Sequence, residues 1–590
     1  MASVDAVLPK MNGGAFLVED NSPEDVFTLE DLTQEHLAIA RTAAEFWAKD
    51  VEPNIEAIRH QEPGAALNTL RKAAEIGLTA ISIPERFGGM ELDLASALVA
   101  EEHVGRDGSF GGWFGAHTGI GTLPVLYFGR EEQKQKYLPK LAKVELLGAY
   151  ALTEPHAGSD ALAARTRADL SPDGKHYILN GQKMWITNGG AADLFTVFAK
   201  IGGEKFTAFL VERAFGGVTS GAEERKMGIK GSSTTAVYFE NVKVPVENLL
   251  GEIGRGHVIA FNILNMGRLK LGALAVGGAK DVLAISLKYS KARKAFGWAI
   301  AEFGAIQYKL SEMAIRIYAA ESLAWRLVGL IEGQLQGFSW DQPDASQTML
   351  KALEQYAAEC SILKVYGSEA LDYVVDEGVQ IHGGYGFHQD YAVERAYRDS
   401  RINRIFEGTN EINRLLITGM LLKRAARGQL ALVPAVQALM GQLQSGNIGV
   451  GAGDEERRLV QNAKKIALLT IGLAFQKYQV DLEKQQEVSM ALADIIMEVF
   501  AMESALLRSR KLVSRGTPTL ATEICAVFLR DAMARVEFAA RQVLGACSEG
   551  TALRSNMQIL RRLAVYDPID GIPLRRNIAK RLLETEHYRL

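Results

Sequence analysis

The sequence has little cysteine, no long apolar run and no excess of basic charge. Its 590 residues include only three cysteines, Cys360, Cys525 and Cys547. These are too few for a disulfide framework and favour a reducing compartment. No segment reaches the roughly 18 uninterrupted apolar residues of a membrane span. The net charge of −4 argues against a nucleic-acid-binding protein that relies on bulk positive charge.

The first 30 residues also lack the features of a targeting segment. They carry several acidic residues against a single lysine, Lys10. They contain neither the apolar run of a secretion signal nor the arginine-rich helix of a transit peptide. We therefore expect an intracellular protein, most simply a bacterial cytoplasmic one.

The length and composition indicate a folded protein with several domains. Hydrophobic residues make up 48% of the chain and charged residues 23%, a balance that excludes disorder as the main state. Because domains usually contain about 100–200 residues, we expect three or four packed units.

The hydrophobic pattern divides the chain into helical and β regions. Apolar residues recur at helical spacing across residues 37–47 and again from about residue 256. Between them, short apolar runs such as Phe206–Val211 alternate with turn pairs such as Asn180-Gly181, as in a β domain. The glycine-rich stretch Ser445–Asp454 is typical of a flexible linker.

These patterns predict an α+β fold that is mostly α-helical, with a β-barrel or β-sandwich domain in the middle. The expected units are an N-terminal extension (1–34), an all-α domain (35–147), a β domain (148–255), a second helical bundle (256–427), a linker (428–454) and a C-terminal helical domain (455–590).

Two stretches near the predicted β domain carry residues that could bind a cofactor. Small and hydroxylated residues in Tyr150–Asp160 can present N–H and hydroxyl groups to a flat polar ring or an anion. A structural turn explains the same residues more simply. Trp185 and Thr187 could provide an aromatic wall and a hydrogen bond, although a core tryptophan beside a turn is the simpler explanation.

Two further stretches suit a diphosphate or a close backbone approach. Arg293 could bind a diphosphate through two parallel hydrogen bonds, but ordinary capping of a helix C-terminus also accounts for Arg293–Gly297. Gly383 and Gly384 permit a ligand or another backbone to come close. Their spacing does not match a dinucleotide-binding fingerprint.

The fifth stretch, Tyr397–Ile412, contains a candidate base. Glu407 lies between the apolar pair Ile405-Phe406 and Gly408. If its carboxylate is removed from water, its pKa rises and it becomes a competent base near neutral pH. A solvated glutamate at the end of a helix is the alternative.

Taken together and in this order, the five stretches resemble the acyl-CoA dehydrogenase family across residues of about 35–427. The order of helical, β and helical regions is also similar. The tail after the linker resembles the extra helical domain of the very-long-chain acyl-CoA dehydrogenase branch, in its bacterial form.

The resemblance implies that FAD binds between the β domain and the second helical domain, with part of its site contributed by a neighbouring subunit. It implies no metal. The implied cofactor-binding residues are Tyr150, Leu152, Thr153, Gly158, Ser159, Trp185, Ile186, Thr187, Arg293, Phe296, Gln307, Gln380, Gly383, Gly384, Thr409 and Glu411. Many family members have glutamine at the last of these positions.

The same resemblance assigns Glu407 as the catalytic base. Other branches carry the base on the helix of Arg268, one residue earlier, where this chain has Gly267. The implied substrate-binding residues are Ser159, Leu264, Asn265, Arg268, Phe406, Gly408, Gly121 and Pro124. The very-long-chain branch has glycine at the last two positions, so we expect long acyl chains from Gly121, while Pro124 departs from the pattern.

The implied reaction is α,β-dehydrogenation of an acyl-CoA to a trans-2-enoyl-CoA, the first step of fatty-acid β-oxidation, with electrons passed to electron-transferring flavoprotein. The alternatives are an acyl-CoA oxidase and a non-catalytic assembly or binding protein. We also expect a homodimer. For the basic stretches Arg508–Arg515 and Arg575–Arg581, a solvated face is favoured over peripheral contact with the inner membrane.

Overall fold

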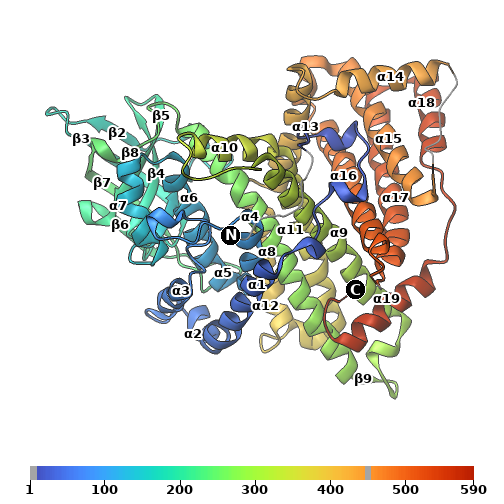
Figure 1. Cartoon of the computed structure of the whole chain (residues 1–590), viewed down its shortest axis with the longest axis horizontal. Helices are drawn as coiled ribbons and strands as arrows, with labels where there is room; N and C mark the ends of the chain where they lie inside the picture. Colours follow the sequence, from blue (N-terminus) through green and yellow to red (C-terminus); the bar gives the residue numbers. More distant parts are fainter. Residues whose placement is uncertain (1–9, 446–452, 518, 590) are drawn as a thin grey trace.

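The computed structural model describes residues 10–445, 453–517 and 519–589. The β domain lies at one end of the molecule and the C-terminal helices at the other, with the second helical domain between them (Figure 1). Part of the predicted glycine-rich linker, residues 446–452, falls outside the described residues.

Capping side chains fix where two N-terminal helices begin. Thr33 accepts a hydrogen bond from the His36 N–H, and Asp93 accepts one from the Ser96 N–H. His36 Nε2 also lies 2.9 Å from Asp93 Oδ2, which ties the two helix starts together. The helices are α1 (Gln34–Phe46), α2 (Ile55–Arg59), α3 (Ala65–Glu75), α4 (Leu94–Val104), α5 (Gly108–Gly115), α6 (Leu123–Phe128) and α7 (Glu131–Ala142), with the π-helical turn η7 (Ala116–Gly121) after α5.

The β domain is an open, sandwich-like sheet. Its strands are β1 (Gly148–Ala151), β2 (Arg167–Leu170), β3 (His176–Thr187), β4 (Leu194–Ile201), β5 (Lys205–Glu212), β6 (Val218–Glu223), β7 (Thr234–Pro245) and β8 (Leu249–Leu250). The order is β6-β7-β3-β2-β4-β5-β8, and β1 pairs in parallel with β4. Because β6 and β8 are not paired with each other, the sheet does not close. The barrel form of the prediction is therefore wrong, and the sandwich form is confirmed.

The two faces of the sheet bury different sets of side chains. Phe195 and Phe209 belong to the cluster inside the folded sheet, whereas Phe198 and Leu210 join the large core shared with the helices. This alternation follows from the two-residue period of a strand. It explains why one domain can both hold its own core and dock on the helical domains.

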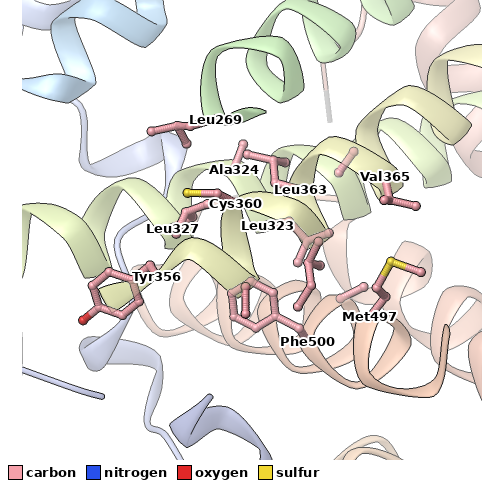
Figure 2. Packing of buried hydrophobic residues seen from close by; sticks show 14 of the residues in the cluster. Leu269, Leu323, Ala324, Leu327, Tyr356, Cys360, Leu363, Val365, Met497 and Phe500 are labelled. Atoms are coloured by element: carbon pink, nitrogen blue, oxygen red, sulfur yellow. The ribbon is translucent and has the colours of Figure 1, made fainter. Parts of the chain in front are cut away.

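The second helical domain is built around α8. Its elements are α8 (Gly256–Ala292), α9 (Gly304–Gln334), α10 (Ala345–Gln355), α11 (Ala357–His382), α12 (Ala392–Ser400) and α13 (Asn410–Ala426), with a hairpin of β9 (Lys294–Ala295) and β10 (Trp298–Ala299). A Cβ added at Gly272 would lie 2.4 Å from Leu363 Cγ, so glycine lets α8 and α11 pack closely. Figure 2 shows Leu269 and Leu363 in the core that continues to Phe500 of the C-terminal domain.

Helix α8 is also long and apolar enough to cross a membrane by length and composition. It is the one such helix among the described residues. Of its most apolar window, 67% is buried inside the molecule. Burial in the core therefore accounts for its composition.

Part of the segment predicted as a linker is helical. The segment predicted as a linker (428–454) contains the helix α14 (Leu432–Gln444). Its apolar side chains dock on the following helix, where an added Cβ at Gly472 would lie 2.6 Å from Val436 Cγ1. The remaining helices are α15 (Glu455–Tyr478), α16 (Gln486–Ser514), α17 (Ala521–Cys547), α18 (Gly550–Leu563) and α19 (Gly571–Thr585).

The N-terminal segment packs against α16, far away in sequence. It forms the short turns η1 (Ala15–Leu17), η2 (Pro23–Asp25) and η3 (Leu29–Asp31). The rings of Phe16 and Phe500 are 4.6 Å apart. Arg508 pairs with Glu30 at 2.6 Å, and Lys511 pairs with Asp31 at 2.6 Å.

These ion pairs correct the interpretation of the basic stretch Arg508–Arg515. Arg508 is 4% exposed and Lys511 is 7% exposed. Neither forms a solvated face, and neither can reach a lipid surface. Their partners include Glu30 and Asp31 of the N-terminal segment, and Arg508 also pairs with the buried Glu321 of α9 at 2.7 Å. The charge pattern of the C-terminal domain alone does not reveal these partners.

Phe16→Ala tests this attachment. Loss of the buried ring should reduce stability by about 3–5 kcal/mol, because the cavity left at the interface cannot be filled by flexible neighbours. The measurement is the midpoint of thermal unfolding. Phe475→Ala is the control, since Phe475 is 52% exposed. An equal change in the two variants would contradict the attachment.

Candidate functional site

Glu407 occupies a tight turn before helix α13. Its φ angle is +57°, and Gly408 follows with φ +80°, so two successive residues adopt the left-handed region that side chains disfavour. Its Oε2 atom is buried and has no hydrogen-bond partner. A strained residue with an unpaired buried carboxylate oxygen indicates a functional position.

Gly267 of α8 makes room for this carboxylate. A Cβ added at residue 267 would lie 2.6 Å from Glu407 Oε2 and 2.9 Å from Cδ. Any larger residue would therefore displace the carboxylate. The position at which the resemblance places the base of other branches is thus the position that the carboxylate of residue 407 packs against here.

Three side chains hold the backbone of the Glu407 turn. Arg268 Nε donates a hydrogen bond to the Glu407 carbonyl at 3.2 Å, and Asn413 Nδ2 donates to the Gly408 carbonyl at 2.8 Å. Lys364 Nζ donates to the same Gly408 carbonyl at 2.7 Å. These contacts fix the carboxylate through its main chain and leave its own oxygen Oε2 unpaired.

The electrostatic environment makes Glu407 a base near neutral pH. Burial raises the pKa of Glu407 to about 7, although the positive charges of Arg268 and Lys364 act in the opposite direction. Burial likewise lowers the pKa of Lys364 to about 8. A carboxylate that titrates near 7 is suited to accept a proton from a weak carbon acid.

A cavity of about 190 Å³ extends from Glu407 between α5, η7, α8 and α12. Thr187 from β3 lines it together with Phe406, Glu407 and Gly267. Glycines form much of one wall; they are Gly108, Gly111, Gly112, Gly115 and Gly119.

A buried ion pair shapes the predicted cofactor-binding edge of the β domain. Lys183 Nζ donates to the Leu152 carbonyl at 3.1 Å and lies 2.7 Å from Glu154 Oε1. On the same strand, Trp185 has φ +56° and is 60% exposed. Burial raises the pKa of Tyr150 well above its usual value, and the charge of Glu407 raises that pKa further.

Other predicted cofactor-binding residues gather at a second hollow. Arg293, Gly383 and Gly384 line it together with Tyr289 and His382. An added Cβ at either glycine would meet no atom within 4 Å. Phe296, 92% exposed, lies on the hairpin beside it. Gln307 donates to the Ala301 carbonyl at 3.0 Å, and Gln380 is exposed at the end of α11.

The remaining predicted residues are placed as follows. Thr409 caps α13 by accepting from the Ile412 N–H, and Glu411 lies exposed in the first turn. Asn265 is buried and accepts from Arg268 Nη1 at 2.9 Å. Five further predicted residues differ in exposure. Gly158 and Ser159 are exposed, Leu264 is half-buried, and Ile186 and Pro124 are buried.

Gly121 does not line the cavity that begins at Glu407, and neither does Pro124. A Cβ at Gly121 would lie 2.8 Å from the Gly148 backbone, so this glycine serves the packing of η7 against β1. The glycines of α5 and η7 that line this cavity lie instead between Gly108 and Gly119.

Two residues that hold the Glu407 turn, Lys364 and Asn413, are not predicted from the sequence. Lys364 reaches the Gly408 carbonyl from 44 residues away, and no local pattern signals that contact. Asn413 lies in α13, six residues beyond Glu407, and its side chain donates to three backbone carbonyls just before and at the start of that helix. No pattern in the sequence signals these contacts.

Comparison with known proteins agrees with this geometry. Domain descriptions of the acyl-CoA dehydrogenase family match residues 33–145 (N-terminal domain), 149–242 (middle domain), and 254–422 and 462–562 (both C-terminal domain). A probable acyl-CoA dehydrogenase of Bacillus subtilis is 47% identical over 582 residues, 98% of each chain. The chain belongs to the acyl-CoA dehydrogenase family.

Two further relatives of this acyl-CoA dehydrogenase family member extend the comparison. The human very long-chain specific acyl-CoA dehydrogenase, a mitochondrial protein, is 37% identical over 502 residues, 78% of this chain and 73% of that protein. A crystal structure of an acyl-CoA dehydrogenase complexed with FAD from Bacillus anthracis matches with a TM-score of 0.96 and 47% identity. It covers 98% of this chain and 100% of that one.

Gly267→Ala tests the contact between α8 and the base. The added methyl group should displace the Glu407 carboxylate by about 1 Å and lower turnover about 100-fold, while alanine keeps the helix folded. The measurements are turnover with an acyl-CoA and the circular dichroism spectrum. Gly419→Ala in α13 is the control, because its Cβ would meet no atom within 4 Å. Equal turnover in the two variants would contradict the contact.

Proposed function

We propose that this chain catalyses the FAD-dependent α,β-dehydrogenation of long-chain acyl-CoA to trans-2-enoyl-CoA and delivers the electrons to electron-transferring flavoprotein. The observation that carries the proposal is the Glu407 carboxylate: Oε2 is buried and unpaired, its pKa is about 7, and it faces the same cavity as Thr187.

The described residues fit FAD. Thr187 lines the cavity on the β-domain side, while the exposed Trp185 ring offers a flat apolar surface beside it. Arg293 and the open glycine pair Gly383-Gly384 suit a diphosphate. When bound, FAD supplies the acceptor for the hydride that leaves the β-carbon.

The chain's own residues then handle the proton. Glu407 accepts the α-proton of the thioester, which is far too weak an acid for a carboxylate in water. Hydrogen bonds to the thioester carbonyl must therefore stabilise the developing negative charge, and we assign one of them to the Glu407 N–H. Arg268, Asn413 and Lys364 hold the turn so that carboxylate and N–H keep their positions.

The long-chain preference rests on two supports. The cavity runs from Glu407 along the glycines of α5 and η7, which place no side chain in it, and a very long-chain specific enzyme is 37% identical to this chain. Arg293 and Gly383 lie at the surface, apart from the Glu407 cavity. We accordingly propose a homodimer in which these residues complete the cofactor site of the neighbouring subunit. A cytoplasmic location is a separate part of the proposal.

Glu407→Gln tests the assignment of the base. The amide keeps the shape of the side chain but cannot accept the proton, so the rate of flavin reduction should fall at least about 100-fold, while FAD stays bound. The measurement is anaerobic titration with palmitoyl-CoA, followed by flavin absorbance. Bleaching at the wild-type rate would show that the base lies elsewhere.

The pH dependence tests the raised pKa of Glu407. Because the base must be ionised, the rate of flavin reduction should rise with pH and reach half its limit near pH 7. Lys364→Met removes a positive charge that favours the carboxylate, so the midpoint should move upward. A midpoint near the ordinary glutamate value of about 4.3 would contradict the buried carboxylate.

The two alternative functions have separate signatures. An acyl-CoA oxidase would consume oxygen during turnover at the same rate with and without electron-transferring flavoprotein. A non-catalytic binding protein would leave the flavin unbleached by acyl-CoA of every chain length.

A further inference from the structure

A second, smaller cavity lies beyond the one that begins at Glu407. Its volume is about 20 Å³, and its wall is largely apolar, with Leu78, Ile81, Ile83, Phe114 and Leu123 among its lining residues. Glu101 and Lys270 are the two residues that line both cavities. The two side chains therefore form the wall between them.

Glu101 and Lys270 make a buried ion pair across three elements. Lys270 Nζ of α8 lies 2.8 Å from Glu101 Oε1 of α4, and the side chains are 11% and 3% exposed. Thr118 Oγ1 of η7 lies 3.2 Å from the same oxygen and 3.4 Å from Lys270 Nζ. Hydrogen bonds and an ion pair among these three side chains thus connect α4, η7 and α8.

The pair lies close to the base and is fitted to the glycine wall. Lys270 follows Gly267 by three residues, about 5 Å along α8, and Gly267 contacts the Glu407 carboxylate. An added Cβ at Gly115 would lie 3.7 Å from Glu101 Oε2, and one at Gly119 would lie 3.7 Å from Lys270 Cδ. A Cβ at either position would make an ordinary van der Waals contact with the ion pair, so the pair packs directly beside these two glycines.

On the basis of the proposed function, we infer that the Glu101–Lys270 ion pair sets the depth to which an acyl chain enters. An apolar chain gains free energy with each methylene it buries against apolar walls. It loses that gain where it would have to separate two desolvated charges, because each charge would then be left unpaired. The apolar cavity behind the pair is closed to the chain while the pair holds.

The double substitution Glu101→Leu with Lys270→Met tests the inference. It removes both charges together, so no unpaired charge is left in the core. The side-chain volumes stay roughly the same. The two cavities should become one apolar space. The ratio of kcat/KM for eicosanoyl-CoA to that for dodecanoyl-CoA should rise at least about ten-fold, since a single buried methylene can be worth that much discrimination.

A matched control uses the neighbouring ion pair on the same two helices. Lys280 Nζ lies 2.5 Å from Glu102 Oε1, and neither residue lines either cavity. Lys280 also pairs with the buried Glu321, so the control is Glu102→Leu alone, which leaves Lys280 paired and should leave the chain-length ratio at its wild-type value. An equal ratio in this control and in the double variant, both folded and loaded with FAD, would overturn the inference.

A measurement on the wild-type holoenzyme does not depend on the folding of any variant. Non-reactive S-alkyl-CoA thioethers from 8 to about 20 carbons should bind more tightly with each added methylene until the chain reaches the ion pair, and then with constant Kd. An unbroken increase in affinity through the whole series would overturn the inference. Failure of every thioether to bind would instead overturn the proposed function.

Discussion

The structure depends on one contact: the Glu407 carboxylate, unpaired at Oε2, packed against the backbone of α8 at Gly267. A carboxylate in that position costs free energy, because it is out of water and its oxygen accepts no hydrogen bond. The surrounding residues compensate through the main chain, where Arg268, Lys364 and Asn413 donate to carbonyls of Glu407 and Gly408. The main-chain carbonyls of the turn thus accept the stabilising hydrogen bonds, while the carboxylate oxygen Oε2 is left unpaired.

The helices around Gly267 are packed so that this contact is kept. Glycines at 267 and 272 allow α8 to touch the base on one side and α11 on the other. The C-terminal domain continues the same core through Phe500 (Figure 2), and the N-terminal segment is fixed to α16 by the pairs Glu30–Arg508 and Asp31–Lys511. The helix that carries Gly267 is thus supported from several directions, which limits the movement of the base.

Much of the fold could be predicted from the sequence, because period and composition are local signals. The residues around Glu407 alone leave a desolvated base and a solvated helix-end glutamate both open, and the family resemblance is what assigns the base. The contacts that hold the Glu407 turn could not be predicted, since Lys364 lies on the distant helix α11. The sequence predicts a linker where α14 lies, because the packing of its apolar side chains against α15 is not visible locally. It predicts surface charges at Arg508 and Lys511, because Glu30 and Asp31, with which they pair, lie some 480 residues earlier.

Burial, and not a neighbouring negative charge, raises the pKa of Glu407. The most direct measurement is the infrared absorbance of the protonated carboxyl group, taken as the difference between the wild-type protein and the Glu407→Gln variant across a pH titration. A carboxylic-acid band that disappears with a midpoint near pH 7 is expected. A midpoint near the ordinary glutamate pKa of about 4.3 would show that the carboxylate is not desolvated.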